Sequence, residues 1–112
     1  MMKLTLLGTG CPSIDYKRCG ASNLVSTKKT KILIDCGSGV TQRLNQSKNS
    51  SADIDALLLT HLHTDHVIDL YQLIISSWHS DRDSIWKIFG PKGTKKFVEK
   101  IFSAWKFERE LR

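Results

Sequence analysis

The sequence predicts a mixed α/β fold, in which helices cover one face of a single sheet. Residues 1–35 contain short apolar runs separated by turns, and after Asp35 such runs alternate with helical patterns. The 112 residues, 40% hydrophobic and 25% charged, are enough for one small domain. No internal repeat or boundary is evident, so residues 1–112 are expected to form one unit. A second sheet is needed to cover the inner face, and the remaining sequence does not supply one.

The first half of the chain is predicted to contain three strands and one helix. Breaker-rich segments bound each apolar run, which is typical of strands joined by turns. Residues 27–30 read as the turn of a hairpin. The predicted strands are Lys3–Leu7, Asn23–Ser26 and Lys31–Asp35, and the predicted helix is Val40–Gln46.

The second half is predicted to continue the alternation of strands and helices. A buried strand at residues 56–60 precedes a helix at residues 67–75, and a polar connection at residues 78–84 leads to a strand at residues 85–89. Thr94 has the residue type of an N-cap. The last helix has an amphipathic pattern, and we expect its apolar face and the three tryptophans in the core: Phe97, Val98, Ile101, Phe102, Trp105, Trp78 and Trp86.

Three of the four histidines lie within six residues, directly after the strand predicted at residues 56–60. Side chains alternate across a strand, so His61 and His63 are expected to point the same way while Leu62 turns into the core. This placement would let the two imidazoles hold one metal ion. Catalytic groups often lie where a loop joins two rigid elements.

A carboxylate completes the cluster. A turn at Thr64 would place Asp65 and His66 at the same end of the strand as His61 and His63. They would be offset from this first pair in a way that suits a second ion. Imidazole and carboxylate together favour zinc, manganese or iron over calcium. The alternative is a polar turn with solvated histidines, which is the usual interpretation of a lone histidine. His79 lies outside the cluster and is not expected to bind metal.

Asp35 and Cys36 allow two interpretations each. Asp35 could orient metal ligands from outside, or it could bond local backbone N–H groups before a glycine turn. We favour the second role and keep contact with the metal ligands open as well. Cys36 is expected to be a small buried residue rather than a ligand.

Charge and cysteine content restrict the partners and the compartment. A net charge of +6 suits a polyanion such as nucleic acid, although many basic proteins bind none. Three cysteines, an odd count, favour a reducing cytoplasm over a disulfide scaffold. No apolar run approaches the ~20 residues that span a membrane, and the N-terminus is too short and too soon interrupted for a secretory signal.

The pattern His-x-His-x-Asp-His after an apolar strand resembles the signature of the metallo-β-lactamase superfamily. The resemblance implies an αββα sandwich, of which this chain would be the N-terminal half, and a dinuclear zinc hydrolase, with Mn²⁺ or Fe²⁺ possible. It also implies that His61 and His63 serve one metal while Asp65 and His66 serve the other. Asp65 would in addition be a catalytic residue that helps to move a proton.

Three further segments resemble the ribonuclease Z branch of that superfamily, which cleaves phosphodiesters at the 3′ ends of transfer RNA precursors. They are Leu7–Gly10, Asp35–Arg43 and Phe89–Gly93. The resemblance implies a transfer RNA precursor as partner. Ser38 and the loop Tyr16–Ser22 depart from the branch's pattern, so a hydrolase of small phosphodiesters or sulfate esters is the alternative.

The resemblance also implies ligands that this chain lacks. The family completes its site with a third histidine, a bridging aspartate and a final histidine far downstream, and after His66 the chain offers only His79. The chain is therefore expected to be inactive alone, as a fragment or as one part of a split enzyme. A complementing C-terminal half or a homodimer would be its partner.

Overall fold

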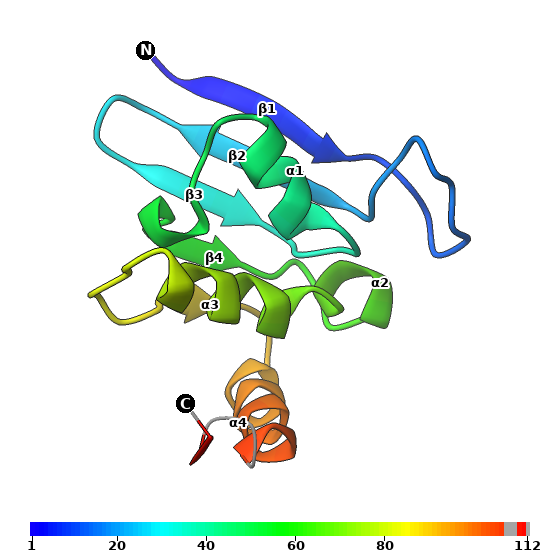
Figure 1. The fold of residues 1–112 in the computed structure, drawn as a ribbon. Coiled ribbons are helices and arrows are strands. Elements are labelled where there is room, and N and C mark those ends of the chain that lie inside the picture. The colour runs from blue at the N-terminus through cyan, green and yellow to red at the C-terminus, as the bar shows by residue number, and fades with distance from the viewer. Residues whose placement is uncertain (107–109, 112) are drawn as a thin grey trace.

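The computed structural model describes residues 1–106 and 110–111. Strands come first and then alternate with helices, as the sequence predicts (Figure 1). The elements are β1 (Lys3–Gly8), β2 (Ser22–Ser26), β3 (Lys31–Ile34), α1 (Val40–Gln46), the 3₁₀-helix η1 (Ser51–Asp53), β4 (Ala56–Leu58), α2 (Thr64–Val67), α3 (Leu70–His79), β5 (Ile88–Phe89) and α4 (Thr94–Ala104).

The strands form one mixed sheet in the order β1-β2-β3-β4-β5. The first two pairs are antiparallel, and β2 and β3 are joined by a tight turn that the Thr27 side chain stabilises by accepting from the backbone N–H of Thr30 at 3.1 Å. The pairs β3–β4 and β4–β5 are parallel, because α1 and α3 carry the chain back between them. The C-terminal ends of β3 and β4 therefore lie side by side at one edge of the sheet.

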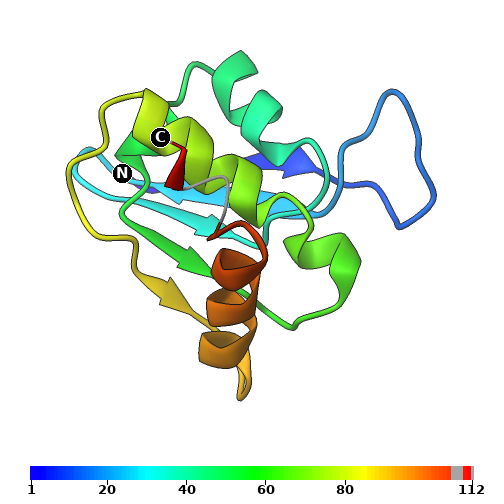
Figure 2. The same ribbon diagram turned by 60° about the horizontal axis from the view of Figure 1, so that its bottom comes forward.

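The core lies between the sheet and the two helices α1 and α3, which cover the same face (Figures 1 and 2). Leu24, Leu33 and Leu57 occupy paired positions on neighbouring strands and are fully buried. Leu44 of α1 and Leu73 of α3 pack onto them. Alternation along the strands places one residue of every two in this core.

The opposite face of the sheet is apolar and open. Leu4 pairs with Val25, and Val25 pairs with Ile32, so the three side chains share that face. Leu6 lies two residues from Leu4 on the same face, and Leu4 and Leu6 are 63% and 64% exposed. The single mixed sheet with helices on one side matches the predicted half of a sandwich.

The boundaries of most strands differ from the prediction by one to three residues, and two regions differ more in kind. The helix expected at residues 67–75 is two helices, and α3 continues through Trp78, which was placed in a connection. The strand β5 contains only Ile88 and Phe89, because residues 85–87 do not have strand geometry.

The N-terminus of α4 also corrects a prediction. The N-cap is Gly93, whose φ of 99° suits glycine, and Thr94 is the first helical residue. The hydroxyl of Thr94 donates to the Pro91 carbonyl at 2.7 Å rather than capping the helix.

Two of the three tryptophans also differ from the prediction. Trp105 is 49% exposed and Trp78 is 42% exposed, so neither is a core residue. Of the helices in the described part of the chain, none is long and apolar enough to cross a membrane.

Candidate metal centre

The histidine cluster lies in the connection between β4 and α2, at the edge where β3 also ends. The strand β4 stops at Leu58, so His61 and His63 lie on an extended segment rather than on the strand itself. Their ring centroids are 4.8 Å apart, and those of His61 and His66 are 4.1 Å apart. The structure thus brings the three predicted histidines together.

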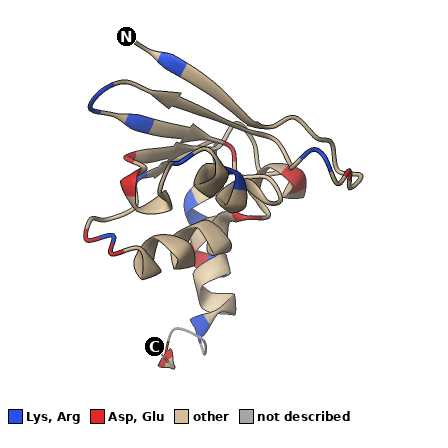
Figure 3. Cartoon of the chain, turned by 45° about the horizontal axis from the view of Figure 1, so that its top comes forward, with Lys and Arg blue, Asp and Glu red and all other residues tan. Residues whose placement is uncertain are grey.

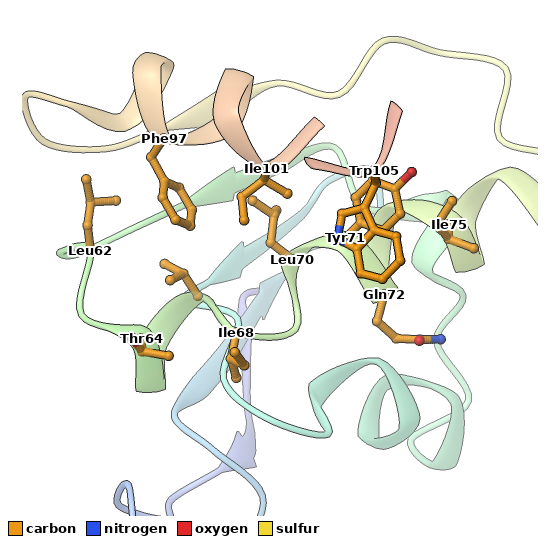
Figure 4. Close-up of a pocket in the computed structure, with 11 residues that line it drawn as sticks. Leu62, Thr64, Ile68, Leu70, Tyr71, Gln72, Ile75, Phe97, Ile101 and Trp105 are labelled. Atoms are coloured by element: carbon orange, nitrogen blue, oxygen red, sulfur yellow. The ribbon is translucent and has the colours of Figure 1, made fainter. Parts of the chain in front are cut away.

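Leu62 points away from the cluster, as predicted. It packs against the core and lines an apolar groove of about 600 Å³ between α3 and α4, with Phe97 opposite it (Figure 4). The alternation of side chains therefore persists beyond the end of β4, and α4 supports the histidine segment from behind.

Asp65 and His66 lie in the first turn of α2. The Asp65 Oδ2 atom is 3.5 Å from the His66 Nε2 atom, so the carboxylate and this ring nitrogen face the same space. Close packing against the loop after β3 holds α2 in place: the Cys36 N–H donates to the His66 carbonyl at 2.7 Å. A Cβ at Gly37 would lie 2.8 Å from the Asp65 carbonyl oxygen, so only glycine allows this approach.

Asp35 connects the ends of β3 and β4. Its Oδ1 accepts the Thr60 backbone N–H at 2.8 Å, and its Oδ2 accepts the Thr60 hydroxyl at 2.7 Å. The same Oδ2 atom lies 2.7 Å from His66 Nδ1. The carboxylate therefore binds groups that are distant in sequence, and one of them is the ring of a predicted ligand, so Asp35 makes the contact that the sequence left open beside its structural role.

These hydrogen bonds define which ring nitrogens carry protons. A carboxylate only accepts, so His66 Nδ1 must donate to Asp35. Thr60 has a single hydroxyl proton, which goes to Asp35, so His61 Nδ1 must donate to the Thr60 oxygen at 2.9 Å. In the neutral rings the Nε2 atoms of His61 and His66 then carry free lone pairs. This is the state in which histidine binds metals.

Asp35 is held in this position by the surrounding backbone. Its φ of 63° lies in the left-handed region, which aspartate tolerates better than most residues. Its N–H donates to Leu58 at 2.8 Å, and its carbonyl accepts the buried Ser22 hydroxyl at 2.8 Å. The side chain is thus oriented before any ligand arrives.

The donor set fits a transition metal in kind. Imidazole nitrogens with free lone pairs and a carboxylate oxygen are ligands of zinc and related ions. In number it is incomplete: within residues 1–106 and 110–111, no three His, Cys, Asp or Glu side chains converge as metal ligands would. The described residues therefore supply fewer converging donors than a catalytic zinc site needs.

Two residues, His79 and Cys36, were not expected to bind metal. His79 is exposed at the end of α3. Cys36 is fully buried, and burial is the main cause that raises the pKa of its thiol, followed by the nearby charges of Asp69 and Asp35. Thr60 was not identified from the sequence, because its role depends on contacts with residues far away in the chain.

Known proteins resemble this chain over most of its length. A family model described as "Anti-Pycsar protein Apyc1" matches residues 2–103. A ribonuclease Z of Mycolicibacterium gilvum (strain PYR-GCK) is 43% identical over 112 residues, which cover 96% of this chain and 39% of that protein. A ribonuclease Z of Mycobacterium bovis (strain BCG / Pasteur 1173P2) is 41% identical over 108 residues, covering 94% and 39%. The chain thus spans about two fifths of the length of these relatives.

Solved structures show the same fold. Human tRNase Z, short form, superposes with a TM-score of 0.80 at 28% identity, covering 93% of this chain and 39% of that one. The metallo-β-lactamase fold protein YhfI from Bacillus subtilis gives a TM-score of 0.76 at 24% identity, covering 88% and 40%. The predicted resemblance to ribonuclease Z and the predicted partial sandwich are confirmed. The chain belongs to the family described as Anti-Pycsar protein Apyc1, and it has part of a metallo-β-lactamase fold of the kind found in ribonuclease Z.

Proposed function

We propose that this chain supplies one half of the active site of a metal-dependent phosphodiester hydrolase. The observation that supports this proposal is a hydrogen-bonded network of four residues, Asp35, Thr60, His61 and His66. It leaves two Nε2 lone pairs free beside the Asp65 carboxylate. A solvated turn would not need a buried carboxylate to orient its histidines. The relatives named ribonuclease Z support phosphodiester cleavage as the reaction.

Each residue has a defined task in this proposal. His61 and His63 would hold one metal ion and Asp65 and His66 the other, with zinc as the first candidate and Mn²⁺ or Fe²⁺ as alternatives. Bound metal ions would lower the pKa of a water molecule and offset the charge of the phosphate. Asp65 would accept a proton at its carboxylate, and Asp35 would keep the His66 ring from rotating.

The donor set requires completion. A catalytic zinc normally takes three protein ligands and keeps one position for water, whereas no three donors converge among the described residues. We therefore expect no measurable phosphodiesterase activity from the 112-residue chain alone with added zinc or manganese. Activity should require a complementing polypeptide, equivalent to the rest of ribonuclease Z, or a second copy. Turnover by a purified monomer of 112 residues would contradict this.

Metal content tests the assignment of ligands. Zinc bound to the complemented protein is to be measured by mass spectrometry for alanine variants of His61, His63, His66 and, as the control, His79. The first three variants should lose zinc, because each removes a donor from a pair. His79→Ala should keep it, because His79 is exposed at the end of α3. Loss of zinc in the His79 variant alone would overturn the assignment.

RNA, in particular a transfer RNA precursor, is the proposed substrate. Lys and Arg are spread over the β2–β3 turn, the loop between β1 and β2, and α4 (Figure 3), and the net charge is +6. Each neutralised phosphate releases counterions, so affinity for precursor RNA should fall steeply as salt rises. A flat salt dependence in a binding titration would contradict RNA as the substrate.

A small phosphodiester is the second candidate. A cavity of about 650 Å³ adjoins His63 and Asp65, which is within the range of about 300–1,000 Å³ that is typical of small-ligand pockets. Comparing turnover of a chromogenic diester with turnover of precursor RNA, in the complemented protein, separates the two candidates.

A cytoplasmic location remains a prediction from the odd number of cysteines, all three of which are free.

A further inference from the structure

Two of the three cysteines lie near the two ends of the loop that joins β1 to β2. Cys11 is exposed, Cys19 is partly buried, and both thiols are free. Both residues line the cavity that adjoins His63 and Asp65. The third cysteine, Cys36, is fully buried in the core. The pair therefore differs from Cys36 in its access to solvent and in its position beside the candidate site.

Backbone contacts bring the two ends of this loop together. The Gly10 N–H donates to the Cys19 carbonyl at 2.9 Å, and a Cβ at Gly10 would lie 2.8 Å from that carbonyl oxygen, so glycine permits the close approach. Cys11 follows Gly10 directly, and consecutive Cα atoms are about 3.8 Å apart. A disulfide closes when two Cα atoms are about 4.4–6.8 Å apart. The paired backbone thus leaves only a small movement of Cys11 for the two sulfurs to meet.

Arg43 of α1 holds the sulfur of Cys19. Its Nε donates to Cys19 Sγ at 3.1 Å, and its Nη2 donates to the Lys17 carbonyl at 2.9 Å. The sulfur also packs against Gly39, where a Cβ would lie 2.8 Å from it. The thiolate is the nucleophilic form of cysteine, and a positively charged N–H donor directed at the sulfur is suited to stabilise that form. Cys19 is therefore oriented as an attacking sulfur, whereas Cys11 is the sulfur that a reagent in solution reaches first.

We infer that Cys11 and Cys19 form a redox-active pair, in which Cys11 reacts with a small-molecule disulfide and Cys19 then closes an internal disulfide across the loop. In the first step the Cys11 thiolate attacks one sulfur of the small disulfide, whose S–S bond breaks. Cys11 becomes a mixed disulfide and one small thiolate leaves. In the second step the Cys19 thiolate attacks the Cys11 sulfur, and the second small thiolate leaves. The two protein thiols lose two electrons and two protons in all, and the small disulfide is reduced to two thiols.

The internal disulfide joins the two ends of a loop that forms one wall of the cavity beside His63 and Asp65. It removes conformations that the reduced loop can adopt, and so it fixes that wall. A reducing compartment keeps both thiols free, so the link forms only when the surroundings become oxidising. Neither a bound metal nor a nucleic acid takes part in this chemistry.

Peptide mapping without reductant tests the pairing in the 112-residue chain. The reduced chain, at submicromolar concentration and in EDTA, is exposed to glutathione disulfide, its remaining thiols are alkylated, and it is digested with trypsin, which cleaves after Lys17 and Arg18. The peptide that contains Cys11 should be linked to the peptide that contains Cys19, while Cys36 stays reduced. In Cys19→Ser the mixed disulfide at Cys11 should persist, and in Cys11→Ser no internal disulfide should form.

The substitution Arg43→Gln measures what the guanidinium contributes. It should slow the conversion of the mixed disulfide into the internal disulfide by about tenfold, because the attacking sulfur loses its charged donor. Arg18→Gln is the matched control, since it removes the same charge from the residue adjacent to Cys19 and leaves the bond from Arg43 Nε to Cys19 Sγ in place. It should change the rate less than twofold. Equal slowing by the two substitutions would overturn the role of Arg43.

The pair itself is overturned by three products in the wild-type chain: a link between the Cys11 residues of two chains, a link to Cys36, or a mixed disulfide at Cys11 that persists. Hydrogen exchange at residues 12–18 gives a second readout. It should slow in the oxidised wild type and stay unchanged in Cys19→Ser that carries the mixed disulfide. Unchanged exchange in the oxidised wild type would show that the link does not fix the loop. None of these results affects the zinc measurements on the histidine variants.

Discussion

At the scale of single residues, Asp35 makes the contacts that orient the candidate site. One buried carboxylate accepts the Thr60 N–H, the Thr60 hydroxyl and the His66 ring, and so joins the ends of β3 and β4. Partners outside the first coordination shell commonly change metal affinity by about 10–100-fold. Asp35 therefore links the packing at the ends of β3 and β4 with the orientation of the histidine rings.

We expect Asp35→Asn to lower zinc affinity of the complemented protein by about tenfold or more, because an amide no longer provides two acceptor oxygens. Asparagine tolerates the left-handed backbone, so the substitution tests the charge rather than the φ of 63°. Asp69→Asn is the control, because among the described residues its carboxylate bonds Gly39 and Thr41 at the start of α1 and not the histidines. Zinc titration against a chelator measures both, and an equal loss in the two variants would contradict the assigned role.

The cysteines should react in an order set by burial. Burial raises the pKa of the Cys36 thiol, so little reactive thiolate forms at neutral pH, and no reagent reaches it in the folded chain. Cys11 is exposed and should be modified first by a disulfide reagent. Cys36 should react only after unfolding, as followed by mass spectrometry. As the pH rises above the ordinary thiol pKa, unfolded chains lose the proton before folded ones do, so stability should fall. Rapid labelling of Cys36 in the native protein would contradict its packing.

At the scale of elements, α4 acts as a support for the histidine segment. Its residues Phe97 and Ile101 line the groove into which Leu62 points (Figure 4), and Trp105 stacks on Tyr71 of α3 with ring centroids 5.3 Å apart. The helix has no donor residue in the cluster. It affects the site through packing against the residue between two of the histidines.

Leu62→Ala should cost about 2 kcal/mol of stability, at the low end for such truncations because the side chain is only partly buried. It should also speed hydrogen exchange at the His66 N–H, which donates to the His63 carbonyl at 2.9 Å. Ile85→Ala is the control, since Ile85 is 85% exposed and should change stability by less than about 0.5 kcal/mol. Thermal unfolding and amide exchange give the two readouts. Unchanged exchange at His66 would show that α4 does not support the segment.

At the scale of the whole molecule, the two faces of the sheet differ. The face toward α1 and α3 contains fully buried leucines, whereas the other presents Leu4 and Leu6 to solvent. Exposed apolar surface of this kind marks an interaction surface or a tendency to aggregate. The relatives, about 2.5 times longer than the stretch they share with this chain, have further sequence that could cover such a face.

The isolated chain should therefore self-associate at micromolar concentration. The double substitution Leu4→Lys and Leu6→Lys should increase the monomer fraction, because two charges on the open face oppose apolar contact. Ile85→Lys, an exposed apolar position outside the sheet, should leave association unchanged. Light scattering over a concentration series measures the effect. A wild-type chain that stays monomeric would show that this face is stable in water.

The sequence by itself determined the features that depend on local periodicity. Apolar runs bounded by breaker residues located β1 to β4, the amphipathic spacing located α4, and the spacing of His61, His63 and His66 identified the cluster. The direction of Leu62 also followed from the alternation of side chains along a strand. These properties depend on neighbours a few residues apart, which a single sequence shows directly.

Only the tertiary structure decided the contacts between distant residues. Asp35 meets Thr60 and His66 across 25 and 31 positions, because parallel pairing places the ends of β3 and β4 together. From residue type, Thr94 was the expected N-cap of α4. Only the structure shows that Gly93, with its positive φ, is the cap. Residue propensity and spacing carry no information about such long-range contacts, because packing between elements sets these contacts.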